Sequence, residues 1–203
     1  MPYPDRFYPV VDTVAWVKRL TALGVGTVQL RAKDLDDAAA TALFREALAV
    51  TAGTATKLVV NDYWRVAIDL GAKHLHLGQE DLAEADVGAI RKAGLTLGLS
   101  THDDEELETA LRAQPDYIAL GPIFPTTLKS MRFAPQGIPK LTVWKKRIGA
   151  LPLVAIGGIK LEQAAEIFAA GADSIAVVSD VTQNADPDTR VKNWLGASAE
   201  AAA

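Results

Sequence analysis

The chain has 203 residues, of which 49% are hydrophobic and 23% charged, a balance typical of one globular domain. Its net charge of −4 does not favour general attraction to nucleic acid or to an anionic membrane, and the absence of cysteine excludes disulfides and thiolate chemistry. The N-terminus lacks the pattern of a signal peptide, and no apolar stretch approaches the roughly 20 residues that span a bilayer. We therefore expect a cytoplasmic protein without nucleic-acid or membrane partners, and a homo-oligomeric state stays open.

Short apolar strands alternate with segments of helical periodicity along the whole chain. The first unit combines a strand at 7–11 with a helix that Asp12 or Thr13 caps and Gly24 ends. The remaining expected strands are 27–31, 57–61, 74–77, 96–100, 116–120, 153–156 and 174–178. The remaining expected helices are 35–52, 64–70, 83–93, 103–112, 141–148, 160–170 and 187–195.

Eight strands that alternate with eight helices predict an α/β fold, the (β/α)8 or TIM barrel, formed by a single domain. The strands are rich in Val, Ile and Leu, as strands covered on both faces are. A doubly wound open sheet is the alternative, although it normally has fewer strands. We assign residues 1–196 to the barrel and the alanine-rich residues 197–203 to a low-complexity tail.

In a TIM barrel, the chemistry takes place at the C-terminal ends of the strands and in the loops that follow them. Those positions are polar in this chain, whereas the opposite ends, such as 24–26 and 71–73, carry turn residues. The polar positions include Gln29, Arg31, Lys33, Asn61, Asp62, Gln79, Asp81, Ser100, Thr101, His102, Ser179 and Asp180. This one-sided polarity predicts an enzyme.

Gln29, Arg31 and Lys33 follow one another at a spacing of two, so they point the same way if the second strand continues to Lys33. Such a set would hold a polyanion, since the guanidinium offers a planar fork to phosphate and the ammonium a point charge. The alternative is that the strand stops early and leaves Arg31 and Lys33 as solvated loop charges, paired with Asp34 or Asp36.

Asp62 and Asp81 come just after consecutive strands, which lie roughly 5 Å apart in a sheet. Their carboxylates can converge on one hard cation, and oxygen ligands suit Mg²⁺, which usually bridges to a substrate phosphate. The alternative is that each aspartate caps the helix that follows it.

The longest connection runs from Asp116 to Gly137, and it crowds hydroxyls and cations at Thr126, Thr127, Lys129, Ser130 and Arg132. Loops of this length in compact domains are usually functional or disordered. We expect a mobile lid over an anionic substrate.

Gly157 and Gly158 follow the seventh strand, and Val178 and Ser179 end the eighth. TIM barrels often bind phosphate at this place through backbone N–H groups. The chain therefore predicts two phosphate sites, one metal-bound near strands two to four and one at strands seven and eight. Such an arrangement suits a transferase from which diphosphate departs.

The three histidines show no spacing typical of a metal site. His74 and His76 alternate on a strand, and His102 begins a loop. We assign all three a structural role by default.

The segments QLRAK, LVVND, HLGQED, GLSTH, GPIFPT with APQG, and AIGGI with AVVS resemble the thiamine phosphate synthase family in order and over nearly the whole chain. The resemblance implies a transferase of thiamine biosynthesis that joins 4-amino-2-methyl-5-pyrimidinylmethyl diphosphate to 4-methyl-5-(2-hydroxyethyl)thiazole phosphate. The products would be thiamine phosphate and diphosphate. In this family the C–O bond is thought to break first, leaving a pyrimidinyl carbocation that the thiazole nitrogen captures.

The resemblance also implies roles for individual residues. Asp62 and Asp81 would bind Mg²⁺, and Ser100 would lie beside the departing diphosphate. The residues expected to bind the pyrimidine and its diphosphate are Gln29, Asn61, Arg31, Lys33, Ser100 and Lys129. The residues expected to bind the thiazole phosphate are Thr126, Gly158, Val178 and Ser179. Among these, Ser100, Lys129 and Arg31 are the expected catalytic residues.

Two positions depart from the family pattern. The loop usually reads Thr-x-Thr-Lys, whereas Leu128 stands here at the second threonine, and Asp180 adds negative charge beside Ser179. One alternative is a thiazole tautomerase, which resembles a synthase without the metal aspartates and with a catalytic histidine on strand five. Another is a non-catalytic barrel that binds phosphate ligands.

Overall fold

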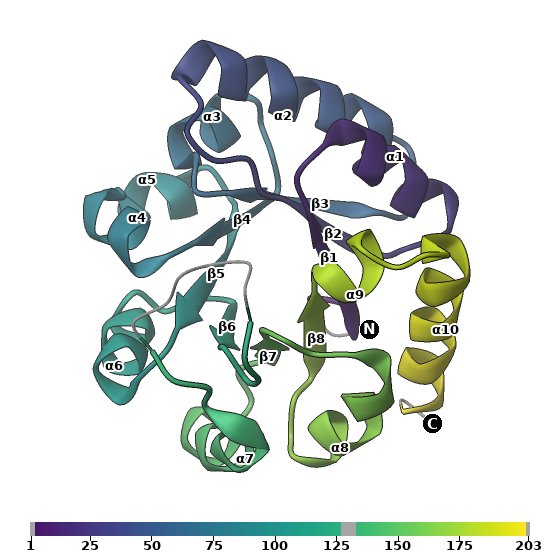
Figure 1. Ribbon diagram of the computed structural model, residues 1–203. Helices are drawn as coiled ribbons and strands as arrows, with labels where there is room; N and C mark the ends of the chain where they lie inside the picture. The colour runs from purple at the N-terminus through teal and green to yellow at the C-terminus, as the bar shows by residue number, and fades with distance from the viewer. Residues whose placement is uncertain (1–2, 127–132, 202–203) are drawn as a thin grey trace.

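The computed structural model describes residues 3–126 and 133–201. Its parallel strands form one closed barrel in chain order, from β1 to β8, and Figure 1 looks along that barrel with the helices arranged around the strands. The barrel closes where β1 pairs with β8, with Phe7 opposite Ile175. The predicted (β/α)8 barrel is thus confirmed.

The strands begin and end within one residue of the expected positions. They are β1 (Phe7–Val11), β2 (Thr27–Leu30), β3 (Lys57–Asn61), β4 (His74–Leu77), β5 (Thr96–Thr101), β6 (Tyr117–Leu120), β7 (Leu153–Ile156) and β8 (Ser174–Val177). The helices are α1 (Val14–Ala22), α2 (Asp37–Thr51), α3 (Trp64–Asp69), α4 (Gln79–Glu84), α5 (Val87–Lys92), α6 (Asp104–Arg112), α7 (Gly137–Ile148), the 3₁₀ turn η1 (Leu161–Gln163), α8 (Ala164–Ala169), α9 (Ser179–Thr182) and α10 (Pro187–Glu200).

The helices differ from expectation in several places: the expected helix 83–93 divides between α4 and α5, α7 begins at Gly137 instead of residue 141, and the short helix α9 was not expected. α4 follows β4 directly, where the sequence suggested a loop, because Glu80 and Asp81 suit a first helical turn and Leu82 is buried. Separately, α10 continues to Glu200 and buries Ser198, so most of the alanine-rich segment beyond residue 196 belongs to a packed helix.

The core has two layers. The larger one lies between the strands and the helices and includes the fully buried Trp144 and Trp194. The smaller one fills the barrel interior and includes Tyr8, Val59 and Tyr117. The Tyr117 ring fits inside because β5 has Gly98 opposite it: a Cβ at Gly98 would lie 1.9 Å from the ring.

The N-terminal end of the barrel is closed by the first described residues. Tyr3 stacks on His74 with ring centroids 4.6 Å apart. The carboxylate of Asp5 accepts hydrogen bonds from Thr27 Oγ1 at 2.5 Å and Lys57 Nζ at 2.9 Å. The opposite end carries the polar residues singled out from the sequence. None of the helices within residues 3–126 and 133–201 has the length and apolarity to cross a membrane.

Candidate active site

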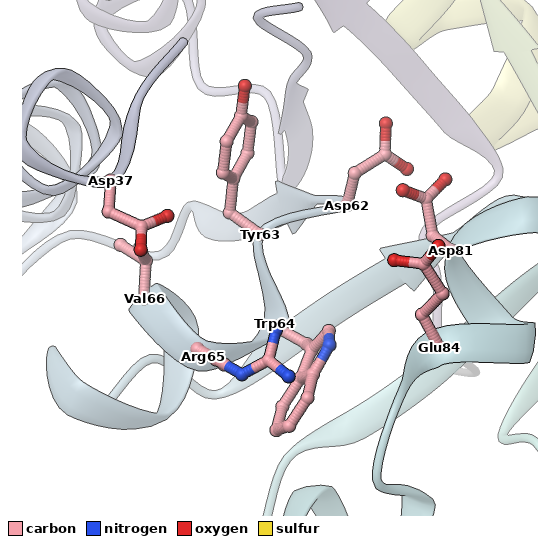
Figure 2. A pocket seen from close by; sticks show the side chains of 8 residues that line it. All are labelled: Asp37, Asp62, Tyr63, Trp64, Arg65, Val66, Asp81 and Glu84. Atoms are coloured by element: carbon pink, nitrogen blue, oxygen red, sulfur yellow. The ribbon is translucent and has the colours of Figure 1, made fainter. Parts of the chain in front are cut away.

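Two carboxylates meet at the C-terminal ends of β3 and β4. Asp62 directly follows β3, and Asp81 lies in the first turn of α4. Figure 2 shows their carboxylates facing each other. The cavity here has a volume of about 140 Å³ and is lined by Asp37, Asp62, Tyr63, Trp64, Arg65, Val66, Asp81 and Glu84. The structure thus brings the two aspartates together, as their places after neighbouring strands predicted.

Neither aspartate caps a helix. The N-cap of α3 is Tyr63, which makes no side-chain cap bond, and the N-cap of α4 is Gly78. Asp62 has a φ of 67°, in the left-handed region, which aspartate tolerates better than most residues other than glycine. Such backbone positions gather at functional sites. The capping alternative is therefore excluded, and the geometry favours a binding role for both carboxylates.

The pKa values of Asp62 and Asp81 depend on Lys33 and on the closeness of the two carboxylates. Lys33 Nζ lies 2.7 Å from Asp62 Oδ2. Burial acts to raise the pKa of Asp62, but the hydrogen bond and charge of Lys33 hold that pKa below its ordinary value. Burial raises the pKa of Asp81, and the negative charge of Asp62 raises it further. This pattern is typical of two carboxylates close enough to share one proton or one cation.

Mg²⁺ fits this donor set. Its ordinary protein ligands are one or two carboxylates, and waters and substrate phosphates complete its coordination. Among residues 3–126 and 133–201, no three His, Cys, Asp or Glu side chains gather in a way that could hold a metal ion by themselves. A metal between Asp62 and Asp81 would therefore depend on water and a bound anion for its other ligands.

Gln29, Arg31 and Lys33 do not form one row of side chains along a single strand. β2 ends at Leu30, so the strand does not continue to Lys33 as the first hypothesis required. Gln29 is buried inside the barrel, Arg31 is half-buried, and Lys33 is exposed. Lys33 pairs with Asp62 across the strands and not with a neighbouring aspartate. Lys33 therefore lies beside the carboxylate pair because the loop after β2 carries it there.

Asn61 ends β3 next to this cluster. Its side chain is 3% exposed, and Nδ2 is buried without a hydrogen-bond partner in the described part of the chain. A buried donor left unpaired costs roughly 1–3 kcal/mol, and such groups in native proteins call for an explanation. A ligand that accepts a hydrogen bond from Asn61 would supply one.

Ser100 lies on β5, within hydrogen-bonding distance of a histidine that sequence reasoning treated as structural. Its Oγ is 2.7 Å from Nε2 of His76, and Nδ1 of His76 is 2.8 Å from the Tyr117 hydroxyl. Burial lowers the pKa of His76 to about 4, so the ring is neutral at pH 7. The missed signal was the alternation on β4 and β6, which turns His76 and Tyr117 into the barrel among apolar residues.

The loop after β6 packs against the two glycines after β7. Phe124 N donates to Gly157 O at 2.9 Å, and a Cβ at Gly158 would lie 2.5 Å from Pro125 O. Both glycines also have positive φ angles, of 99° and 67°. The glycines are therefore required for the close approach of the loop, which brings Thr126 toward the expected second phosphate site.

Val178 and Ser179 lie where β8 passes into the short helix α9, as expected. The adjacent Asp180 carboxylate is 7% exposed and accepts hydrogen bonds from Arg190 Nε and Nη2, both at 2.9 Å. Trp194 Nε1 donates to it at 2.8 Å. The negative charge that the sequence shows beside Ser179 is therefore held in an ion pair and hydrogen bonds within the protein.

Five of the loop positions discussed above lie outside the described residues: Thr127, Leu128, Lys129, Ser130 and Arg132. The loop is held at its two ends, where Gln136 N donates to Pro122 O at 2.7 Å and Gly137 N to Ile123 O at 3.1 Å. At its second end, the Phe133 ring stacks on His102 with centroids 4.7 Å apart. The described ends of the loop therefore rest on β5, β6 and β7, beside the candidate site.

The chain is similar to known proteins of one family. A family model described as thiamine monophosphate synthase matches residues 7–181. The chain is 56% identical over 195 residues to the thiamine-phosphate synthase of Rhizobium etli, covering 96% of each chain. It is 51% identical over 199 residues to that of Cronobacter sakazakii, covering 97% of this chain and 91% of the relative. A solved thiamine phosphate pyrophosphorylase from Pyrococcus furiosus has the same fold, with a TM-score of 0.85, 24% identity, and coverage of 98% of this chain and 97% of that one.

Proposed function

This chain belongs to the thiamine monophosphate synthase family, and on this premise we propose that its synthase reaction depends on Mg²⁺ held by Asp62 and Asp81. The protein is an enzyme, a transferase whose substrates are small molecules. It joins the 4-amino-2-methyl-5-pyrimidinylmethyl group of a diphosphate to 4-methyl-5-(2-hydroxyethyl)thiazole phosphate. The observation that supports the metal proposal best is the pair of facing carboxylates, Asp62 and Asp81, beside Lys33.

The bond changes need no proton transfer to carbon or nitrogen. The C–O bond between the pyrimidinylmethyl carbon and the diphosphate breaks, and its electron pair leaves with the diphosphate. The thiazole nitrogen then gives its lone pair to the carbocation, and the new C–N bond leaves the positive charge on the thiazolium ring. Catalysis therefore consists of stabilising the departing anion, positioning the two rings and excluding water.

The leaving diphosphate would lie over the C-terminal ends of β2 to β5. Arg31, Lys33 and Lys129 would bind its oxygens, and the Ser100 hydroxyl would donate to the oxygen that gains charge. A bound Mg²⁺ would supply further positive charge at this anion. Because Lys33 already pairs with Asp62, the site keeps positive and negative groups side by side before the substrate arrives.

The two rings would lie between this side and β7 and β8. Gln29 and Asn61 would contact the pyrimidine, and the unpaired Asn61 Nδ2 supports that assignment. Thr126, Gly158, Val178 and Ser179 would hold the thiazole phosphate. The packing of the loop after β6 on Gly157 and Gly158 supports a site in which this loop would cover the thiazole phosphate.

The test is to incubate both substrates with the protein, with and without Mg²⁺, and to follow thiamine phosphate and diphosphate. We expect both products with Mg²⁺ and strongly reduced formation in excess EDTA. Formation of thiamine phosphate at an equal rate in EDTA would contradict the metal proposal. Absence of product both with Mg²⁺ and in EDTA would instead favour a non-catalytic phosphate-binding barrel. A tautomerase role is disfavoured because β5 carries Ser100 and no histidine, and both aspartates are in place.

A further inference from the structure

Five polar side chains form one hydrogen-bonded network inside the barrel. Gln29 Nε2 donates to the Tyr8 hydroxyl at 2.7 Å, which lies 2.8 Å from the Tyr117 hydroxyl. The Tyr117 hydroxyl is 2.8 Å from His76 Nδ1, and His76 Nε2 is 2.7 Å from Ser100 Oγ. This interior network thus connects a residue of the pyrimidine side to the serine of the diphosphate side.

The network is closed to solvent except at Ser100, which is partly exposed. Tyr117 is fully buried, Tyr8 is 1% exposed and His76 is 6% exposed. Within the described part of the chain, the two tyrosine hydroxyls make no hydrogen bond outside the network. Each buried hydroxyl must therefore place its single hydrogen on a neighbour within the network.

This requirement gives the network a direction. The amide nitrogen of Gln29 only donates, so Tyr8 accepts from it and donates its own hydrogen to Tyr117. Tyr117 then donates to Nδ1 of His76, and a neutral imidazole whose Nδ1 accepts carries its hydrogen on Nε2. The reverse order would leave the Tyr8 hydrogen without an acceptor, at roughly 1–3 kcal/mol.

We infer that Tyr8, Tyr117 and His76 are positioning residues that fix the direction of the Ser100 hydroxyl. His76 donates to Ser100 Oγ, so the serine hydrogen points away from the histidine and stays available to an oxygen of the leaving diphosphate. The inference rests on the proposed function, because it takes Ser100 to face the diphosphate. Ser100 alone would touch the substrate, and the other residues would act through it.

Three further observations support a rigid arrangement. Gln79 Nε2 donates to the Ser100 carbonyl at 2.7 Å, which fixes the serine backbone. Gly98 leaves room for the Tyr117 ring, whose hydroxyl could not otherwise reach His76. The His76 and Tyr117 rings also stack, with centroids 5.5 Å apart. A donor held in this way needs no reorganisation when charge develops on the departing oxygen.

The direction of the hydrogen bonds also determines what Gln29, at the other end of the network, offers to a ligand. Because Gln29 donates through Nε2, its Oε1 remains an acceptor. The pyrimidine substrate offers an amino group, which donates, and a diphosphate, which accepts. One network therefore presents an acceptor to the first group and a donor to the second.

The first experiment compares two substitutions of His76. In His76→Gln the amide can place a donor where Nε2 was, whereas in His76→Asn the shorter amide reaches only the Nδ1 position. We expect His76→Asn to lower kcat by roughly 10- to 100-fold with little change in either KM, and His76→Gln to recover most of kcat. His74→Asn, two residues earlier on the same strand face, is the matched control and keeps kcat. Equal kcat for the two His76 variants would overturn the inference.

A double-mutant cycle separates action through Ser100 from a general effect on the core. We expect His76→Asn to lower kcat much less in a Ser100→Ala protein than in the wild type, because the serine hydroxyl it would orient is already gone. If His76→Asn lowers kcat by the same factor in both proteins, His76 acts independently of Ser100, and the inference would fail.

The hydrogen position can also be measured without substitution of the network. In ¹⁵N NMR of the wild-type protein without substrate, we expect His76 to carry its hydrogen on Nε2 and to have a bare Nδ1. The chain has three histidines, so His74→Asn and His102→Asn variants assign the signals. A hydrogen on Nδ1 would overturn the inference even if thiamine phosphate forms. An inactive wild type with the expected tautomer would instead contradict the proposed function.

Discussion

Lys33 Nζ lies 2.7 Å from the Asp62 carboxylate, so a lysine expected to bind the diphosphate rests on a carboxylate expected to bind Mg²⁺. The lysine keeps Asp62 ionised and occupies one of its oxygens. When a metal and a diphosphate enter together, the lysine can move to the anion while the cation takes its place. The same ion pair would therefore compete with a metal that arrives without substrate.

Replacing Lys33 should separate these two effects. In Lys33→Met, we expect the affinity for Mn²⁺ without substrate to rise about 5-fold, because a partly exposed ion pair is worth about 1 kcal/mol at most. The KM for the pyrimidine diphosphate should rise roughly 10-fold, since one charge-assisted contact is lost. EPR measures the affinity for Mn²⁺, and steady-state kinetics measure the KM for the pyrimidine diphosphate. The exposed Lys18→Met is the control, and unchanged or weaker Mn²⁺ binding in Lys33→Met would contradict the prediction.

Asp62 combines a carboxylate role with a left-handed backbone, and two substitutions distinguish them. Asparagine tolerates a φ of 67°, whereas alanine is strained there by about 1–2 kcal/mol. We expect kcat to fall at least about 100-fold in both Asp62→Asn and Asp62→Ala. Only Asp62→Ala should also be less stable, by the strain of about 1–2 kcal/mol. Kinetics at saturating Mg²⁺ and urea denaturation measure both. Near-normal turnover in Asp62→Asn would show that the carboxylate charge is not needed.

Gly158 tests the packing of the loop after β6. A Cβ there would lie 2.5 Å from Pro125 O, whereas at Gly149, with a similar φ of 62°, it would meet nothing within 4 Å. We expect Gly158→Ala to raise the KM for thiazole phosphate roughly 10-fold or more by displacing the loop. Gly149→Ala should lose about 1 kcal/mol of stability from strain alone and keep that KM. Equal KM values for the two variants would mean that the contact between Gly158 and the loop does not affect the binding of thiazole phosphate.

His74, at the closed end of the barrel, should make stability depend on pH. Burial, and secondarily the charge of Lys57, lowers the pKa of His74 to about 4 from an ordinary 6.5. Between these values the unfolded chain binds a proton that the folded protein does not, so the free energy of unfolding falls as pH drops from 6.5 toward 4. The slope amounts to at most ~1.4 kcal/mol per pH unit for one proton.

His74→Asn should reduce that slope while keeping a partner for Thr96, which lies 2.8 Å from His74 Nδ1. Urea denaturation at several pH values across the window measures it. Above pH 7 the slopes of wild type and variant should coincide, which serves as the internal control. Identical slopes inside the window would mean that His74 titrates alike in both states.

The eight strands could be predicted from the sequence because parallel strands covered on both faces are short apolar runs, and each was separated from the next by a helical segment. The places of Asn61, Asp62, Asp81 and Ser100 at the C-terminal strand ends followed from chain order alone. α4 was missed because its polar first turn, with Gln79, Glu80 and Asp81, reads as a loop after the strand. These features depend on neighbours along the chain, which a sequence displays directly.

Only the closed barrel decided which side chains meet. Lys33 reaches Asp62, Arg190 compensates Asp180, and Tyr8 and Tyr117 connect Gln29 to His76, yet these partners are separated by many residues in sequence. Spacing by two indicates that a side chain faces the barrel interior, but not which of the other inward side chains it touches. That depends on strand register and on closure between β1 and β8. The sequence by itself therefore determined the fold and the places of the candidate site residues at the strand ends, and the tertiary structure determined their charge partners and hydrogen-bond directions.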